Sequence, residues 1–330
     1  MFINTDFGLY NLKFATIVHE IGHAIGLLSH APTNSSILSC GTPAWDDYEF
    51  LVFSEQDRAN LVSLWNSNSA ALYSISGTIK SNIQNRSVFV FAVDIVTGHT
   101  YSTLTQSNSS FKINILKPGD YRIFAKDDES FLFATPSKYS PSWYISNTDS
   151  TNDPYTGKVL TLNNNSKSVQ DINIVIIEKT PPFNLFWAYS KDLPGEPNVY
   201  LYSFSKPWDV GDLHLQHTGG DILSVEAYGS NPDYSLGNAQ KTDIDNLSYD
   251  GVSSVDVSIN ENALQGDRLI IARGNNGTIQ AGLVGLYVIG LYPPSYIPYY
   301  KNTIDQNEWI SYQMSGAFDF KSLDPDYWKR

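Results

Sequence analysis

Hydrophobic residues recur at two different spacings, and the change between them divides the chain. From Leu12 to Leu28, and again from about Glu55 to Trp65, apolar residues recur at the three- and four-residue intervals of one helix face. Ser54 precedes the second run, and Asp57 lies three positions after Ser54. This is the capping-box pattern, which satisfies the free N–H groups at a helix start. The first zone is therefore predicted to be helical.

After residue 69 the pattern changes to short alternating segments separated by Gly, Pro and Asn, as is typical of antiparallel β-sandwiches. The segments before Pro181-Pro182 are Ser74–Ile79, Ser87–Val93, Phe111–Leu116, Tyr121–Ala125, Lys158–Leu162 and Ile172–Ile177. Those after it are Asn198–Phe204, Leu213–Gln216, Ile222–Tyr228, Val252–Ile259, Arg268–Ala272 and Gly282–Leu291. The proline pair marks an expected linker. We expect a multidomain, mainly β chain with a short helical unit at 1–69, an antiparallel β-sandwich at 70–180 and a second at 181–330.

The composition of the chain argues against several classes of function. The 330 residues include 34 acidic and 21 basic side chains, for a net charge of -13, and no Lys/Arg cluster could follow a phosphate backbone. We therefore expect no nucleic-acid partner. No segment reaches the roughly 18 apolar residues of a membrane-spanning helix, so we expect no membrane span. The single cysteine, Cys40, excludes an internal disulfide, so the fold must depend on its core or on a metal.

The most informative stretch is His19-Glu20-Ile21-Gly22-His23, with Gly26 and His30 after it. Two histidines four positions apart on a helix project from one face, which suits two imidazoles on one tetrahedral zinc. Glu20, beside the first histidine, can reach a zinc-bound water as a general base. Gly26 can end the helix in a left-handed conformation, so that the chain turns back and His30 approaches the metal from outside the helix.

This stretch resembles the metzincin zinc proteases, and their matrixin branch in particular, whose signature is HExxHxxGxxH followed by a methionine-containing turn. The similarity extends to three neighbouring segments: Ile3–Asp6, Ser36–Leu38 and Phe53–Trp65. By position, the resemblance implies that His19 and His23 bind Zn²⁺ and that Glu20 is the general base. Leu38 stands where the family has the methionine of its turn, and can still pack beneath the site. The implied reaction is hydrolysis of a peptide bond in a protein or peptide substrate.

The sequence departs from the family pattern at the third zinc ligand. That pattern places the ligand ten residues after the first histidine, where this sequence has Ser29, and His30 comes one position later. Either the turn absorbs one extra residue and His30 binds the metal, or the site keeps two imidazoles and an open position, which would weaken metal binding. In the family a sheet also precedes the motif, whereas eighteen residues precede His19 here, so we expect the carboxyl-terminal part of such a catalytic domain.

A second resemblance covers the first β zone. Its segments Ser76–Ile79, Val88–Val93 and Phe111–Ile123 resemble the transthyretin-like carboxypeptidase regulatory domain, with Leu116-x-Pro118-Gly119-x-Tyr121 as the best marker. Pro118-Gly119 is expected to make a tight turn that lets two strands pair, with the ring of Tyr121 over the end of the sandwich. The resemblance implies an accessory spacer or a weak binding module.

For the remaining histidines and the tryptophans, the sequence predicts ordinary structural positions. His99, His214 and His217 lie in predicted β segments and are expected at the surface. Four tryptophans could stack on sugars if exposed, but are more simply explained as core or interdomain residues: Trp143, Trp208, Trp309 and Trp328.

Two functions follow from these patterns. The first is a zinc-dependent endopeptidase, the carboxyl-terminal half of a secreted matrixin-like enzyme whose signal peptide would lie upstream. The alternative is a non-enzymatic extracellular binding or adhesion protein, in which the β domains bind a surface polymer and the metal site is vestigial. Both interpretations place the protein outside the cell or at its surface.

Overall fold

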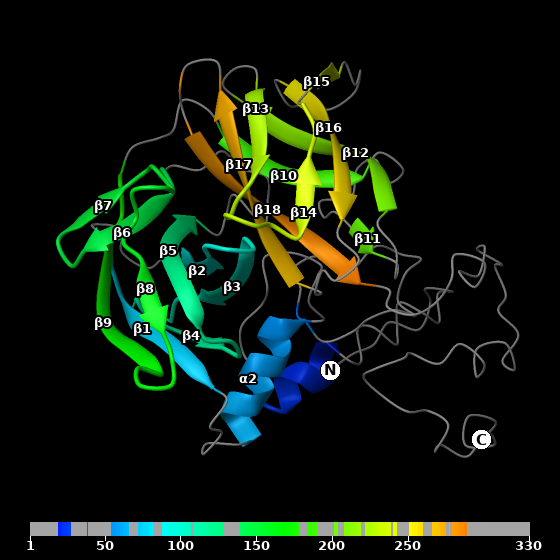
Figure 1. Cartoon of the computed structure of the whole chain (residues 1–330). Helices are drawn as coiled ribbons and strands as arrows, with labels where there is room; N and C mark the ends of the chain where they lie inside the picture. Colours follow the sequence, from blue (N-terminus) through cyan, green and yellow to red (C-terminus); the bar gives the residue numbers. More distant parts are fainter. Residues whose placement is uncertain are drawn as a thin grey trace, which may run out of the picture.

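The computed structural model describes residues 19–27, 38, 54–65, 72–81, 88–106, 109–127, 139–178, 184–190, 201–203, 208–218, 222–238, 240–242, 251–259, 266–274, 277 and 279–288. Within these ranges the chain is mainly β, as the sequence predicts, with two helical segments at one end of the β structure (Figure 1). Pro181-Pro182, predicted as a linker, lies outside the described residues. None of the described helices is long and apolar enough to cross a bilayer.

The first β unit is a sandwich of two sheets. Its strands are β1 (Tyr73–Lys80), β2 (Val88–Asp94), β3 (His99–Leu104), β4 (Ser110–Ile115), β5 (Gly119–Asp127), β6 (Ser142–Ser146), β7 (Asp149–Thr151), β8 (Leu160–Leu162) and β9 (Ser168–Val175). One sheet has the order β4–β1–β9, with β1 antiparallel to β4 and parallel to β9. The facing sheet contains β3–β2–β5–β6–β7, with β8 paired to β5.

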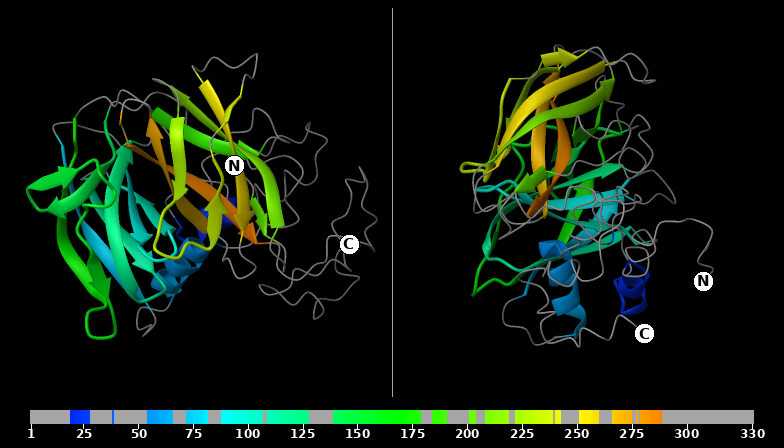
Figure 2. Two further views of the ribbon diagram at one scale, coloured as in Figure 1. Left: turned by 45° about the horizontal axis from the view of Figure 1, so that its top comes forward. Right: turned by 90° about the vertical axis from the view of Figure 1, so that its right-hand side faces the viewer.

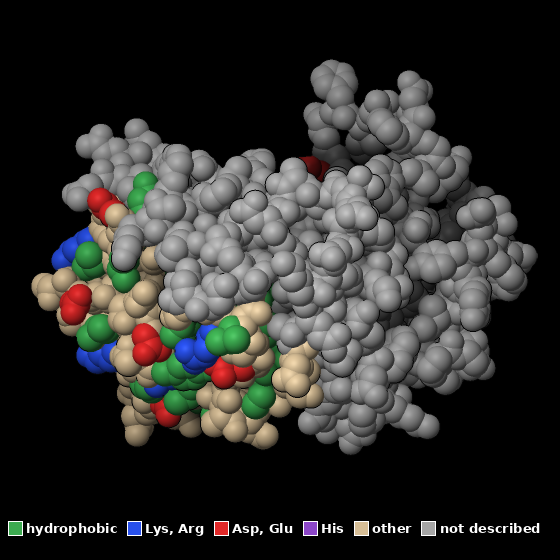
Figure 3. Space-filling view, turned by 90° about the horizontal axis from the view of Figure 1, so that it is seen from above, with side chains coloured by type: hydrophobic (Ala, Val, Ile, Leu, Met, Phe, Trp, Pro, Cys, Tyr) green, Lys and Arg blue, Asp and Glu red, His purple; other side chains and the backbone are tan. Residues whose placement is uncertain are grey.

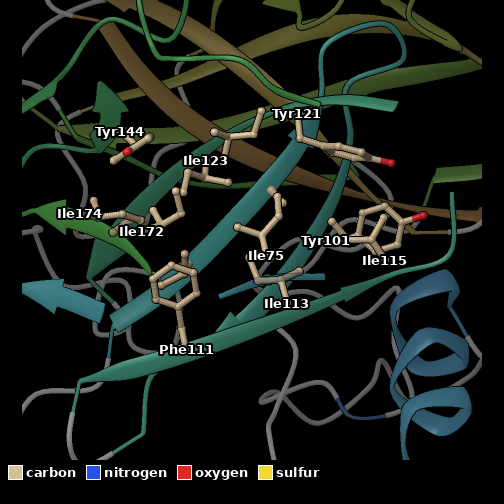
Figure 4. Packing of buried hydrophobic residues seen from close by; sticks show 14 of the residues in the cluster. Ile75, Tyr101, Phe111, Ile113, Ile115, Tyr121, Ile123, Tyr144, Ile172 and Ile174 are labelled. Carbon is tan, nitrogen blue, oxygen red and sulfur yellow. The ribbon is translucent and has the colours of Figure 1, made fainter. Parts of the chain in front are cut away.

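The core of this sandwich follows from the period-two alternation of its strands. Ile75, Ile113 and Ile123 come from β1, β4 and β5 and are each 0% exposed, and Figure 4 shows them pointing toward one another between the sheets. The side chains that alternate with them point away from this core. The alternation recognised in the sequence is therefore the pattern of an inward-facing and an outward-facing side on each strand.

The segment around Pro118-Gly119 differs from its prediction. It does not join a hairpin, because β4 and β5 belong to different sheets, so residues 116–118 carry the chain from one layer of the sandwich to the other. The ring of Tyr121, predicted over the end of the sandwich, is fully buried in its core, and its hydroxyl donates a hydrogen bond of 3.0 Å to the carbonyl of Lys117. This bond closes the end of the sandwich by tying the start of β5 to the crossing segment.

The second β unit continues the larger sheet of the first. Its strands are β10 (Asn184–Ser190), β11 (Leu201–Ser203), β12 (Trp208–Thr218), β13 (Ile222–Ala227), β14 (Tyr234–Leu236), β15 (Gln240–Thr242), β16 (Gly251–Ile259), β17 (Gly266–Gly274) and β18 (Ile279–Val288). Two residue pairs, Thr100↔Asp267 and His99↔Arg268, join β3 to β17. The result is a ten-stranded sheet that crosses both units (Figure 2). Eight strands follow the order β11–β18–β17–β3–β2–β5–β6–β7, and β13 and β8 pair with β17 and β5 beside this path. A separate five-stranded sheet contains β10, β12, β14, β15 and β16.

A second hydrophobic core lies on the other face of this long sheet. The first unit contributes Phe89, Phe91, Val93, Phe124 and Trp143, and the second contributes Tyr228, Leu269, Ile271, Ala281 and Leu283. All of these side chains are at most 5% exposed. We call this group the shared core, because neither unit could bury it alone. At about 25 cal/mol per Å² of apolar surface, burial of so many large side chains fixes the two units to each other.

Helix α2 (Glu55–Trp65) begins and ends where the sequence predicts. Ser54 and Asp57 form a complete capping box: the Ser54 amide donates to Asp57 Oδ2 at 2.8 Å, and the Asp57 amide donates to Ser54 Oγ at 3.1 Å. The helix lies across the open side of the first sandwich. Gln56 Oε1 accepts a hydrogen bond of 2.8 Å from the amide of Ser102 in β3, and Asn114 Nδ2 in β4 donates to Asn60 Oδ1 at 3.1 Å.

Candidate functional site

The histidine motif lies on a short helical segment, residues 19–24, that ends as the sequence predicts. Gly26 has a φ of 105°, in the left-handed region that favours glycine. Its amide donates to the carbonyl of His23 at 3.0 Å, and the amide of Leu27 donates to the carbonyl of Gly22 at 3.0 Å. These two bonds are the Schellman pattern of a helix end, so the chain reverses immediately after the histidines.

His19 and His23 point to a common spot. Their ring centroids are 4.6 Å apart with the rings nearly perpendicular, and their Nε2 atoms are 3.0 Å apart. Two nitrogen ligands on one tetrahedral metal, each at about 2.0 Å, would be separated by roughly 3.3 Å. At 3.0 Å the two nitrogens are within hydrogen-bonding distance of each other, and a small separation of the rings would bring them to the spacing of two ligands on one metal ion.

A backbone contact also orients the second imidazole. His23 Nδ1 lies 2.7 Å from the carbonyl oxygen of Leu27. Because a carbonyl oxygen only accepts hydrogen bonds, Nδ1 carries the proton and Nε2 of the neutral ring carries the lone pair. Histidines that bind metals usually donate their other ring N–H in this way.

Leu38 lies behind the same helical segment. Its side chain is 2% exposed, and its Cδ2 atom lies 2.8 Å from the position that a Cβ at residue 22 would occupy. The leucine therefore packs closely against Gly22, in the turn between the two histidines. A larger residue at position 22 would displace the Leu38 side chain.

The described residues do not complete a metal centre around this pair. Ser29 and His30, the two alternatives for the third ligand, lie outside the described ranges, and Glu20 is half-buried. Among the residues that the structure describes, no group of three His, Cys, Asp or Glu side chains is placed to hold a metal ion. A catalytic zinc site uses three protein ligands, so the part of the chain in view supplies two of three.

The classification as a hydrolase and metalloprotease of the metzincin type is accordingly corrected. It requires a metal centre of at least three protein ligands, and the described part of the chain contains none. What the structure does show of the protein is its β architecture.

Two further expectations can be compared with the structure. His99, expected at the surface, is 6% exposed, because β3 is flanked by strands on both sides and its imidazole occupies the space beside Gly266. Trp143 is fully buried, which confirms the core interpretation and excludes it as an exposed sugar-binding ring. Trp208, His214 and His217 lie in β12, whose side chains are outside the description.

A column of stacked aromatic rings runs from the shared core to the surface. Phe124 stacks on Trp143 with centroids 4.3 Å apart, Trp143 stacks on Tyr228 at 6.0 Å, and Tyr228 stacks on Tyr155 at 5.5 Å. The planes of neighbouring rings differ by 25 to 28°. Tyr155 ends the column and is 40% exposed, so an aromatic ring is held at the surface by the rings beneath it.

Charged side chains surround the outer ring of this column. The hydroxyl of Tyr155 donates a 2.8 Å hydrogen bond to Glu226 Oε1, and Arg273 Nη2 donates to the same oxygen at 2.9 Å. The Arg273 guanidinium carbon lies 5.9 Å from the centroid of the Tyr155 ring, within cation–π range. We call Tyr155, Glu226 and Arg273 the surface aromatic cluster. Burial, followed by the hydrogen bond to Glu226, raises the pKa of Tyr155, so its hydroxyl remains a donor at neutral pH.

The loop that carries Tyr155 is ordered by its own hydrogen bonds. The Tyr155 amide donates to Asp153 Oδ1 at 2.8 Å, and the Asp153 amide donates to Thr151 Oγ1 at 3.1 Å. Arg122 joins the loop to the second unit, because it donates to the carbonyl of Gly157 at 2.8 Å and to the hydroxyl of Tyr228 at 2.7 Å. Sequence reasoning missed this cluster because Tyr155, Glu226 and Arg273 are far apart in the chain and no motif connects them.

The upper face of the molecule adds no competing site within the part that is described. Hydrophobic side chains there are interspersed with acidic and basic ones and do not form one large apolar patch (Figure 3). Such mixed surfaces are ordinary for soluble proteins. The described features that stand out are therefore the histidine pair and the surface aromatic cluster.

No protein-family model matches the sequence, and no curated protein matches it either. Among solved structures, a candidate adhesin from Bacteroides ovatus is 8% identical with a TM-score of 0.21, and the match covers 70% of this chain and 92% of that one. The SGBP-B protein of the Bacteroides ovatus mixed-linkage glucan utilization locus, in complex with a mixed-linkage heptasaccharide, is 13% identical with a TM-score of 0.20, covering 65% of this chain and 40% of that one.

A third structure, the N-terminal eight Ig domains of the Down Syndrome Cell Adhesion Molecule, is 15% identical with a TM-score of 0.21, covering 67% of this chain and 27% of that one. The chain thus spans most of the adhesin and less than half of the other two proteins. TM-scores near 0.2 are too low to carry an argument about function.

Proposed function

We propose that this chain is a non-enzymatic binding protein of the cell surface or extracellular space, in which the β units contact a surface polymer and the histidine pair is a vestigial metal site. The observation that carries the proposal is the shared core. It joins two β units into one body through five buried side chains from each. A rigid body of this kind presents loops and strand ends in fixed positions, which is what a binding scaffold requires.

The charge of the chain narrows the class of polymer. A net charge of -13 repels polyanions such as nucleic acids and acidic polysaccharides. A neutral polysaccharide meets no such repulsion. Neutral polymers are therefore the partners that the proposal names first.

The proposal is tested by native electrophoresis of the full chain in gels that contain neutral polysaccharides, with mixed-linkage glucan, xylan and galactomannan as the probes. We expect at least one polymer to slow the wild-type chain relative to serum albumin. We expect Glu20→Ala to be slowed equally, because Glu20 is the general base of the peptidase interpretation and has no part in polymer binding. Equal mobility of wild-type chain in all gels would contradict the proposal.

A vestigial metal site also predicts weak metal binding. Two imidazoles on a helix turn give far less binding free energy than the four-ligand sites that hold structural zinc, so we expect a dissociation constant for Zn²⁺ of about 1 µM or weaker. Isothermal titration with zinc chloride measures it. His19→Ala and His23→Ala should each abolish the heat of binding, whereas His30→Ala should leave it unchanged. Nanomolar binding that His30→Ala weakens would show that the site is complete rather than vestigial.

A further inference from the structure

The surface aromatic cluster combines the chemical groups that recognise a sugar. Tyr155 is 40% exposed and offers part of an apolar ring, with the Glu226 carboxylate at its hydroxyl as an acceptor and the Arg273 guanidinium, 5.9 Å from the ring centroid, as a donor group. A pyranose presents apolar C–H faces together with hydroxyls that donate and accept at once. We propose that Tyr155, Glu226 and Arg273 form the contact site for a neutral polysaccharide, an inference that rests on the proposed function and locates it.

The ring is already fixed in the orientation that such contact needs. Tyr228 lies beneath Tyr155 with the planes 28° apart, and Arg122 fixes Tyr228 by a hydrogen bond of 2.7 Å to its hydroxyl. The hydroxyl of Tyr155 is fixed by Glu226 at 2.8 Å. Because the side chain is ordered before binding, little conformational entropy is lost when a ligand stacks on it.

The polar groups at the ring remain accessible. The Glu226 side chain is 44% exposed and that of Arg273 is 36% exposed, so both are in contact with solvent while paired with each other. Exposed ion pairs of this kind contribute little stability, at most about 1 kcal/mol. Hydroxyls of a ligand can therefore bond to the outer oxygens and nitrogens of the pair without a large cost.

The charges at the site argue against other polymers. Glu226 and Arg273 together carry no net charge, so the site itself does not attract a phosphate or sulfate group, and the overall negative charge of the chain repels one. A lipid tail could cover the ring but would remove water from the Glu226–Arg273 ion pair, at a desolvation cost. A ligand with many neutral hydroxyls can contact the ring and bond to both charged groups together.

The two β units contribute jointly to this site. Tyr155 belongs to the first unit, whereas Glu226 lies on β13 and Arg273 on β17 of the second. The shared core lies beneath them and fixes the positions of the three side chains relative to one another. Binding therefore depends on the assembled pair of units and is not expected of either unit alone.

The test compares the retardation of variants in the polysaccharide gels described above. Tyr155→Ala should weaken binding at least tenfold, whereas Tyr155→Trp should retain it, because an indole offers a plane of at least the same size. Trp65→Ala is the matched control: that ring is 74% exposed on α2, and its loss should change nothing. Near-UV circular dichroism verifies that each variant is folded.

Arg273→Ala provides a second variant that we expect to stay folded, because the Arg273 side chain is partly exposed. We expect it to weaken binding several-fold. Binding by Tyr155→Ala and Arg273→Ala as strong as that of the wild-type chain would overturn this site and leave the proposed function standing. A wild-type chain that no polymer retards would overturn both.

Discussion

His99 lies where three parts of the molecule meet. Its Nδ1 atom is 3.9 Å from Glu55 Oε2 of α2, its ring stands edge-on to Tyr101 of β3, and its Nε2 atom fills the space that a side chain at Gly266 of β17 would need. Burial is the main cause that lowers its pKa well below 6.5, and the nearby charges of Arg268 and Lys117 lower it further. The imidazole is therefore neutral in the folded chain at neutral pH.

This residue makes stability depend on pH in a defined direction. In the unfolded chain the pKa is near 6.5, so below that value the unfolded chain binds more protons than the folded one. The stability that the neutral imidazole contributes is therefore fully present above pH 6.5. It is lost as the pH falls from 6.5 through the pKa of His99 in the folded chain. Urea titrations between pH 7 and 5 should show a loss approaching about 1.4 kcal/mol per pH unit.

His99→Phe should remove this part of the slope, because phenylalanine cannot take up a proton, whatever it does to absolute stability. His23→Gln is the matched control, since His23 lies on the helical segment, where it contacts His19 and Leu27. An unchanged slope in His99→Phe would show that other groups cause the acid sensitivity.

At the scale of elements, α2 closes the open side of the first sandwich with polar contacts. Glu55 accepts a hydrogen bond of 2.9 Å from the hydroxyl of Tyr101 and lies 3.3 Å from Lys117 Nζ, and Gln56 covers the Ser102 amide of β3. Unpaired edge groups of a strand invite association with other chains. The helix therefore covers the part of β3 beyond Thr100, where the pairing of β3 with β17 ends.

The capping box sets how firmly this helix is held. Ser54→Ala removes the hydrogen bond to the Asp57 amide and leaves the 2% exposed carboxylate of Asp57 with one donor fewer. We expect a loss of about 1 to 2 kcal/mol in the free energy of unfolding, measured by urea titration. Arg58→Ala, at an exposed position of the same helix, should change it by less than about 0.5 kcal/mol. Equal losses in both variants would contradict a specific role of the cap.

Local patterns predicted local structure well. The bounds of α2, the left-handed Gly26 and the common face of His19 and His23 all depend on residues within one or two helix turns, so the sequence contains the whole signal. The sequence pattern did not predict the strand β3. Its residues, His-Thr-Tyr-Ser-Thr-Leu, lack the alternation of apolar and polar positions that is typical of a strand with one face exposed. It is buried on both sides by partners that lie far along the chain.

The surface aromatic cluster could not be predicted for the same reason. Its three side chains are brought together only by the pairing of β13 with β17 and by the stacking of Tyr228 on Tyr155. Neither contact can be recognised from the spacing of residues along the chain. Tertiary packing, and not residue type, determines which of the 21 tyrosines carries the site.

At the scale of the whole molecule, the shared core predicts that the two β units unfold together. Ile271 in the second unit and Ile113 in the first are both 0% exposed, so replacement of either by alanine should cost about 2 to 5 kcal/mol. Near-UV and far-UV circular dichroism should follow one common transition in each variant, shifted to lower urea. Two separate transitions, of which each variant shifts only one, would show instead that the units are energetically independent.

The shared core also determines what happens while the chain is being synthesised. Trp143 and the phenylalanines beside it leave the ribosome about 140 residues before Leu283, the last residue of the core. At a synthesis rate of 5 to 20 residues per second, that face of the first sandwich stays uncovered for roughly 7 to 28 seconds, until the second unit has been made. During that interval the nascent chain presents a sheet of bare aromatic side chains, so production of soluble protein should depend on a chaperone that holds it.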